Sequence, residues 1–214
     1  MTETRPLRVG PRVGAQAFSR IRRKMELSHF KWDAQIGDVT TLTPYALLIT
    51  PSTWNELARL AEALTRETLA MEAELLGRPE LHDELALPRP LRELLQRGEP
   101  TPSAVRTMRF DFHYTTDGWR ISEVNSDVPG GFTEASAFTQ YMSNATPGTR
   151  PTGDPTKAIV DAMERVIGRS GKSGVVALMN APGHMEDHQV VAHLASTLCA
   201  RGRRLPSSRR CLRA

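Results

Sequence analysis

The feature that most constrains the fold of this chain is a pair of short segments with strand-like alternation, joined by a turn signal. In RFDFHY, residues 109–114, aromatic residues occupy every second position and polar residues lie between them. Alternate residues of a β-strand point to opposite faces of a sheet, so this segment predicts a strand with one apolar and one polar face. The segment WRISEVN, residues 119–125, follows directly after Asp117 and Gly118. We therefore predict an antiparallel hairpin.

The length of the turn decides which residues of the two strands face each other. With a two-residue turn at Asp117 and Gly118, Glu123 falls among the aromatic residues, where a carboxylate without a partner is costly to bury. A three-residue loop, residues 116–118, with Gly118 in a left-handed conformation, shifts the pairing by one residue. Asp111 then faces Glu123. We predict this register, which places two opposed carboxylates on one face.

Opposed carboxylates on one face favour a cation, because like charges directly across a strand pair are destabilising. Asp111, Glu123 and the side-chain amide of Asn125 offer the hard oxygen ligands that suit Mg²⁺. Arg109 faces Asn125 in this register, and its guanidinium suits phosphoryl or carboxylate oxygens. The alternative is a solvated sheet face on which Arg109 and Asn125 soften the charge, and the spacing alone leaves both interpretations open.

The motif of these residues resembles a segment of a known family. Arg109-x-Asp111 is followed, fourteen residues after the arginine, by Glu123-x-Asn125, then by a Pro/Gly-rich loop and TEA at residues 133–135. This pattern resembles the magnesium-binding segment of the glutathionylspermidine synthase-like, circularly permuted ATP-grasp ligases. The chain has Val-Pro-Gly after the asparagine segment where the synthase has serines and alanine, so glutathione is not implied as the substrate.

Other segments extend the resemblance over about residues 28–202. They are KWDAQIGD at residues 31–38, VVALMN at residues 175–180, and APGHMED at residues 181–187 with the helix expected after it. These segments are similar to the pre-ATP-grasp domain of the same family. The resemblance therefore implies an α/β fold, with an ATP-grasp-like mixed sheet and flanking helices, and the start of a Rossmann-like pre-ATP-grasp unit that is truncated.

The resemblance also implies an activity and its site. The activity is ATP-dependent carboxylate–amine ligation, in which an amide bond forms through an acyl phosphate, with ATP and Mg²⁺ as cofactors. Asp111, Glu123 and Asn125 are implied as metal ligands, and Arg109 as the catalytic and cofactor-binding residue that steadies the transferred phosphate. In permuted members the nucleotide-binding lysines lie further downstream, so we expect an incomplete fragment that lacks the nucleotide-binding lobe.

The sequence predicts four parts along the chain, with helices after Thr53 and Asp154. We expect a loose basic arm at residues 1–27, an ATP-grasp magnesium-binding portion at 28–150, the start of a pre-ATP-grasp-like domain at 151–202, and a disordered Arg-rich tail at 203–214. Further helices are expected around residues 90–97 and 185–200, and strands at residues 45–50 and 174–180.

The charge distribution and the hydropathy of the chain limit the kinds of partner that we expect. The net charge of +4 comes from the last fourteen residues, which hold six arginines and no acid, and the remaining chain has 22 basic and 24 acidic residues. We therefore expect small-molecule carboxylate and amine substrates, and no nucleic acid. Apolar runs are far shorter than the roughly 20 residues that cross a bilayer, which predicts a cytoplasmic protein without a membrane partner. The alternatives are a non-catalytic binding or scaffold protein that retains the fold and, more weakly, an RNA-associated protein that uses the tail.

Overall fold

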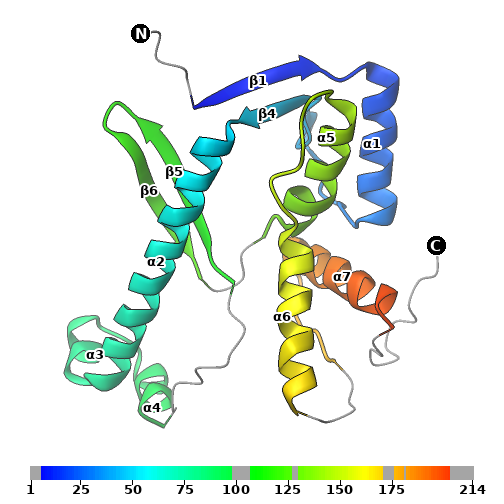
Figure 1. Cartoon of the computed structure of the whole chain (residues 1–214). Helices are drawn as coiled ribbons and strands as arrows, with labels where there is room; N and C mark the ends of the chain where they lie inside the picture. The colour runs from blue at the N-terminus through cyan, green and yellow to red at the C-terminus, as the bar shows by residue number, and fades with distance from the viewer. Residues whose placement is uncertain (1–5, 98–106, 127–129, 171–175, 181, 203–214) are drawn as a thin grey trace. The chain divides into compact units, whose positions relative to one another are not determined.

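The computed structural model describes residues 6–97, 107–126, 130–170, 176–180 and 182–202. The chain divides into two compact units: a first unit formed by Met1–Thr50 together with Asn125–Ala214, and a second unit formed by Pro51–Val124. Figure 1 shows the helices and strands of both units. The fold is mixed α/β with small antiparallel sheets, as expected in its coarse class. These two units are defined by their compactness alone. They do not test the four functional parts expected from the sequence, which stay a prediction.

The first unit begins with a strand, β1 (Leu7–Arg12), and a helix, α1 (Ala15–Ser28). Strand β1 pairs antiparallel with β4 (Tyr45–Ile49), with Val9 opposite Leu47. The expectation of a loose arm over these residues is wrong. The reason is that Ile21 and Met25, four residues apart on α1, are both buried and give the helix a core-facing side.

Two short strands and a helical segment complete this part of the first unit. Strands β2 (Gln35–Ile36) and β3 (Val39–Thr40) form a small hairpin. A π-helix, η1 (Glu134–Phe138), runs directly into α5 (Thr139–Ala145). Side chains of α1, η1 and α5 contribute to or pack against one apolar cluster, whose buried residues are Val13, Ile21, Met25, Leu42 and Met142.

Two longer helices form the rest of the first unit. They are α6 (Pro155–Ser170) and α7 (Met185–Ala200), both predicted from the sequence. The carboxylate of Asp154 accepts a hydrogen bond of 2.9 Å from the backbone N–H of Lys157, as expected for a residue that precedes a helix. A second apolar cluster lies between the helices and contains Phe132, Val160, Val190, Leu194 and Leu198.

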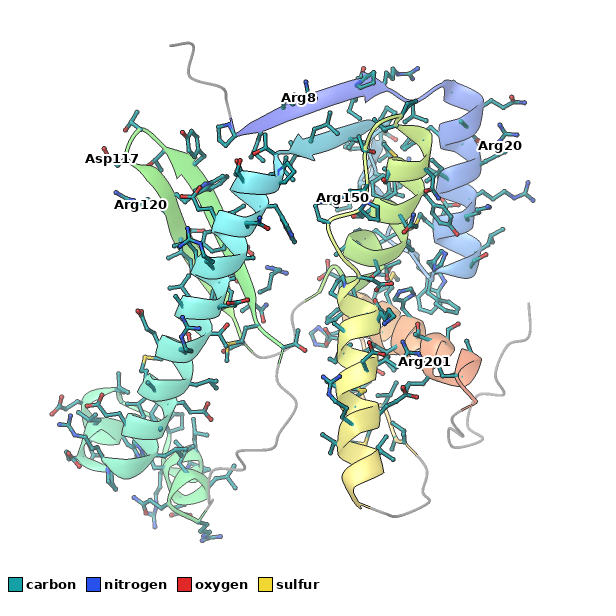
Figure 2. The ribbon with its side chains drawn as sticks, viewed as in Figure 1. Arg8, Arg20, Asp117, Arg120, Arg150 and Arg201 are labelled. Carbon is teal, nitrogen blue, oxygen red and sulfur yellow. The ribbon has the colours of Figure 1, made fainter. Side chains whose placement is uncertain are left out.

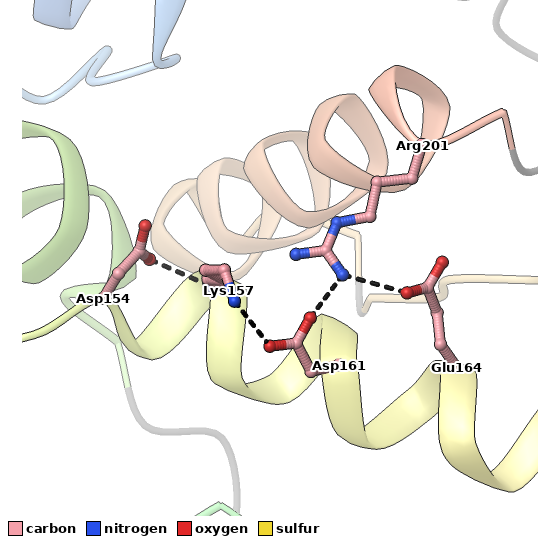
Figure 3. Close-up of polar contacts among 5 residues, drawn as sticks. All are labelled: Asp154, Lys157, Asp161, Glu164 and Arg201. Atoms are coloured by element: carbon pink, nitrogen blue, oxygen red, sulfur yellow. Dashed lines mark hydrogen bonds and ion pairs between the residues drawn. The ribbon is translucent and has the colours of Figure 1, made fainter.

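Arg201, which lies just after α7, links the end of that helix to α6 through two ion pairs. One guanidinium nitrogen, Nη1, lies 2.5 Å from Asp161 Oδ1 and 2.9 Å from Glu164 Oε2 (Figure 3). Lys157 also donates to Asp161, and the hydrogen bonds from Lys157 and Arg201 lower the pKa of this carboxyl. The contacts therefore join two helices that are far apart in the sequence.

The strand predicted at residues 174–180 does not form in residues 176–180, the part of it that the structure describes. Val176 and Leu178 instead pack against the second apolar cluster. A strand needs a neighbour for its backbone groups, and none of the sheets among the described residues includes this segment. These two apolar side chains therefore pack on α6 and α7 without forming a strand. The start of a Rossmann-like unit stays a prediction.

The second unit contains α2 (Pro51–Gly77), α3 (Glu80–Glu84), α4 (Arg89–Arg97) and the strands β5 (Arg109–Thr115) and β6 (Gly118–Asn125). Asn125, the last residue of β6, falls within the first unit by compactness. Of the described side chains in the second unit, Thr53 and His82 are buried and no apolar one is. No helix in the described ranges has the length and apolar character to cross a membrane.

Candidate functional site

The predicted hairpin forms and carries the predicted residues on its two strands. Arg109 and Asp111 lie on β5, and Glu123 and Asn125 lie on β6. The two strands pair with each other in a two-stranded sheet. Figure 2 labels Asp117 and Arg120 near the turn of the hairpin.

One side-chain contact across the hairpin identifies the residues of its first face. His113 Nε2 lies 2.7 Å from Ser122 Oγ, and that hydroxyl also lies 3.4 Å from the backbone carbonyl oxygen of Asp111. His113 and Ser122 must share a face to make this hydrogen bond. Asp111 is two residues from His113, so its side chain belongs to the same face.

A second contact identifies the opposite face. The rings of Tyr114 and Trp119 pack edge to face, with their centroids 5.0 Å apart. Glu123 is four residues from Trp119 and adjacent to Ser122, so the alternation of β6 places it on the face of these rings. The expectation that Asp111 faces Glu123 is therefore wrong, because the two carboxylates lie on opposite faces of the hairpin.

The observed register is favoured because it brings more apolar side chains together on one face of the hairpin. In the predicted register, Trp119 and Ile121 would lie on the polar face with Asp111. In the observed one, they join the aromatic residues of β5, and Glu123 is the polar exception, which the structure leaves exposed. Two large apolar side chains outweigh one carboxylate that keeps its water. The left-handed conformation predicted for Gly118 is confirmed, with φ of 87°.

Arg109 engages Asp111 within the same strand. Its Nε donates to Oδ1 at 2.9 Å, and its Nη2 donates to Oδ2 at 3.3 Å. The Asp111 carboxylate therefore already has a cationic partner, and Glu123 points away from it. These residues do not present one ligand set to a Mg²⁺ ion in this register. In the described part of the chain, no group of three or more His, Cys, Asp or Glu side chains is placed to hold a metal.

A second polar group, not predicted as a site, lies in the first unit. We call it the Lys31 cluster, and it contains Lys31, Asp33, Glu134 and Gln189. Lys31 is 7% exposed, and its Nζ lies 2.6 Å from Asp33 Oδ1 and 2.5 Å from Glu134 Oε1. Glu134 is the first residue of the π-helix η1, a helix type that is frequent at functional sites.

The charges of the Lys31 cluster stabilise one another. Burial alone would lower the pKa of Lys31, but the hydrogen bonds to Asp33 and Glu134 raise it above its ordinary value. Burial would raise the pKa of Asp33, but hydrogen bonds from Lys31 and Gln189 lower it. Lys31 therefore stays charged at neutral pH, and it is a binding and positioning group rather than a base.

The backbone next to Lys31 is fixed by α7. The backbone N–H of Trp32 donates to Gln189 Oε1 at 2.9 Å, and Gln189 is 4% exposed. The Trp32 ring also packs edge to face on His188, with centroids 5.3 Å apart. Phe30, on the other side of Lys31, has φ of 61°, a left-handed conformation that is strained for a bulky residue. This segment is therefore held in a conformation that its own sequence does not favour.

Two neighbouring histidines border the cluster. The rings of His29 and His193 lie 5.5 Å apart, and His29 Nε2 is 2.9 Å from the hydroxyl of Tyr141. Burial, with a smaller contribution from Lys24, lowers the pKa of His29. Burial and the neighbouring His29 lower the pKa of His193 to about 4, against the smaller opposing effects of nearby acids. His193 is therefore neutral at pH 7 and can act there as a hydrogen-bond donor or acceptor.

The sequence contained a signal for part of this group. Lys31 and Asp33 belong to KWDAQIGD and Glu134 to TEA, two segments on which the family resemblance depended, although no single residue in them was predicted to act. His29, His193 and Gln189 had no such signal, because nothing local distinguishes them from residues of a helix or loop. Their proximity depends on contacts between segments as much as 157 residues apart.

Comparisons with known proteins find no relative of this chain. The chain matches no family model, and neither curated proteins nor solved structures give a match to it.

Proposed function

We propose that this chain is part of an ATP-dependent carboxylate–amine ligase similar to the glutathionylspermidine synthase-like ATP-grasp enzymes. The observation that carries the proposal is the Lys31 cluster. Lys31 and Asp33 come from KWDAQIGD, Glu134 comes from TEA, and Gln189 comes from the helix after APGHMED. The resemblance rests on these segments, on the hairpin and on residues 175–180. These segments meet around the buried side chains of Lys31 and Gln189, which is what a shared site requires.

The proposed reaction has two steps. A carboxylate oxygen of the acid attacks the terminal phosphate of ATP, which gives an acyl phosphate and ADP. The amine then attacks the acyl carbon, loses a proton, and releases inorganic phosphate as the amide forms. ATP with Mg²⁺ would supply the phosphoryl group in an activated form. The substrates are small molecules, and a cytoplasmic supply of ATP agrees with the location expected from the sequence.

The roles of this chain's own residues follow from their surroundings. Lys31, a buried cation held by two carboxylates, would orient Asp33 and Glu134, which keep 23% and 35% of their side chains exposed. The exposed parts of these carboxylates can accept hydrogen bonds from an ammonium or hydroxyl group of a substrate. In the family role, Arg109 would contact the transferred phosphate, and Asp111 is its partner on the strand.

A second candidate function is a non-catalytic binding protein, and one observation favours it. Asp111 and Glu123 lie on opposite faces of the hairpin, so the donor set that the family uses for magnesium is not assembled. A protein that kept the Lys31 cluster without this donor set would bind a substrate and not activate it.

One experiment separates these functions. The purified chain would be incubated with ATP, Mg²⁺ and pairs of small carboxylates and amines, and the release of ADP and phosphate would be measured. The ligase proposal expects phosphate release that requires both an acid and an amine. Arg109→Met should abolish it, whereas Arg120→Met, a matched change near the turn of the same hairpin, should not. Binding of an acid or amine without any phosphate release would favour the binding protein.

A further inference from the structure

Strands β1 and β4 leave one face of their sheet exposed. Residues that lie opposite each other in a strand pair share a face, and so do alternate residues along one strand. The register therefore places six residues on this face, which are Leu7, Val9, Arg12, Tyr45, Leu47 and Ile49. Val9 is 69% exposed, Leu47 is 66% exposed and Tyr45 is 42% exposed. We call this apolar, solvent-exposed set the β1–β4 face.

The opposite face of the same sheet packs on the core of the first unit. Ala46 contacts the first apolar cluster, and Gly10 is buried beside it. A Cβ atom at Gly10 would lie 3.2 Å from the backbone oxygen of Ala46 and 3.3 Å from Leu48 Cδ1, so this side of the sheet is tightly packed. One face of the sheet therefore covers the core, and the apolar side chains of the β1–β4 face do not.

A β-bulge places a cation on the exposed apolar face. Between the pairs Val9–Leu47 and Arg12–Tyr45, β1 has two residues where β4 has one. Simple alternation from Val9 would put Arg12 on the core side, where a guanidinium without a partner is costly to bury. The extra residue of the bulge brings Arg12 to the exposed face, opposite Tyr45.

The sequence around the β1–β4 face is strongly basic. Residues 6–25 contain six arginine and lysine residues and no acid. Five of the six are exposed, and Figure 2 labels one on each of β1 and α1; they are Arg8, Arg12, Arg20, Arg23 and Lys24. Within the described ranges, the four exposed arginines have no ion-pair or hydrogen-bond partner. Positive charge therefore surrounds an exposed apolar face.

This charge and the small size of the face limit the kind of partner. A second copy of the chain would bring the same unpaired arginines together, and like charges repel. A stable protein interface uses about 20 to 30 residues a side, whereas this face has six. Nucleic acid would pair with the arginines, but its phosphates and sugars offer no apolar surface to Val9 and Leu47. An anionic bilayer surface offers negative headgroups and apolar acyl chains together.

We propose that the β1–β4 face binds the surface of an anionic lipid bilayer. Val9 and Leu47 would enter the boundary between headgroups and acyl chains, with Arg12 and the cations of α1 at the lipid phosphates. Tyr45 suits the same depth, because its ring is apolar and its hydroxyl is polar. The expectation of no membrane partner rested on the lack of bilayer-crossing apolar runs, and a surface contact needs no such run. This inference goes beyond the proposed function and uses no residue of the Lys31 cluster.

The test is co-sedimentation of the full chain with lipid vesicles. The parent should bind vesicles that contain phosphatidylserine and should not bind vesicles of phosphatidylcholine alone. Arg12→Gln should weaken binding about five-fold, which is the effect of one cation at an anionic lipid surface. Leu47→Ser should weaken it roughly ten-fold through the lost burial of its side chain. Both residues are exposed in the free protein, so circular dichroism should show that the variants fold as the parent does.

Ile36→Ser and Arg150→Gln are the matched controls. Ile36 is 69% exposed on β2, and Arg150 is exposed between α5 and α6. Neither belongs to the β1–β4 face, so neither change should alter vesicle binding. The arginines of residues 203–214 also attract anionic lipid, and they are present in every variant. The conclusion therefore depends on differences between variants of the full chain.

Two results with vesicles would overturn the proposal. One is a parent that does not bind phosphatidylserine vesicles, and the other is a Leu47→Ser variant that binds them as the parent does, because the contact would then be one of charge alone. The chain would also be tested for binding to an RNA oligonucleotide by fluorescence anisotropy and for self-association by sedimentation velocity. A complex of either kind that Leu47→Ser disrupts would assign the face to that partner and overturn the lipid proposal.

Discussion

Lys31→Met is the change that should reveal most about the first unit. It removes two ion pairs, to Asp33 and Glu134, and leaves the carboxylates without their cation. Hydrogen bonds to charged groups contribute about 1.5 to 3 kcal/mol each to stability. Both carboxylates are partly exposed and can recover water, so the lower end of that range applies to each. The burial cost of the ammonium also disappears, and we expect a net loss of about 2 to 3 kcal/mol.

Chemical or thermal unfolding would measure this loss. For a chain of this size, a loss of that magnitude lowers the unfolding midpoint by about 4 to 12 °C. The matched control is Lys157→Met, because Lys157 is 64% exposed and pairs with Asp161 on the surface of α6. An exposed pair of this kind contributes less than about 0.5 kcal/mol. Equal midpoints for the two variants would refute the structural role given to Lys31.

The effect of Lys31→Met should also depend on pH. The pKa of Asp33 is lowered in the folded protein, so its contribution is present above its ordinary value near 3.8 and is lost as pH falls through the folded value. The pKa of Lys31 is raised, so its contribution is present below about 10.5 and is lost above its folded value. The difference between parent and variant should therefore be constant from about pH 5 to pH 10 and should shrink at lower pH.

Three other changes have defined outcomes. His193→Gln should flatten the pH dependence of unfolding: the lowered pKa of His193 makes its destabilisation grow from about pH 6.5 down to about 4, on the order of 3 kcal/mol, and a variant with the parent's profile would contradict this. Arg201→Met should lower the denaturant midpoint of unfolding slightly, since it releases Asp161 and Glu164 at the end of α7, and an unchanged midpoint would mean that these ion pairs add nothing to stability. Met25→Ala, at a residue that is 0% exposed, should cost about 2 to 5 kcal/mol through the cavity it leaves, and a loss below 1 kcal/mol would mean that α1 does not pack as described.

Local sequence patterns predicted most of the secondary structure. Helix α2 follows from its apolar repeat and its end at Gly77, and α6 follows from Asp154 and Pro155 at its start. The hairpin follows from the alternation of β5 and from Gly118. These signals lie within a few residues of the element that they specify, so the sequence alone can show them.

The pairing of the hairpin was harder to predict because two apolar preferences compete within it. If only the burial of Glu123 is considered, the register in which Asp111 faces Glu123 is favoured. If the burial of Trp119 and Ile121 is also considered, the observed register is favoured. A strand register reverses with a shift of one residue, so a small error in this balance moves both carboxylates. For this reason Asp111 and Glu123, two of the predicted metal ligands, lie on opposite faces of the hairpin.

The Lys31 cluster lay beyond local prediction for a different reason. Its lysine and its glutamate are about a hundred residues apart, and Gln189 is farther still. No periodicity connects such positions, and a single sequence does not show which residues vary together. The predicted tail at residues 203–214 lies outside the described residues.

The most direct test of the ligase account follows an oxygen atom. A carboxylate substrate labelled with ¹⁸O in both oxygens would be incubated with the chain, ATP, Mg²⁺ and an amine, and the released phosphate would be analysed by mass spectrometry. If the acid is activated as an acyl phosphate, the bridging oxygen leaves with the phosphate, so each phosphate released should carry one ¹⁸O. Amide product accompanied by phosphate without ¹⁸O would contradict the account.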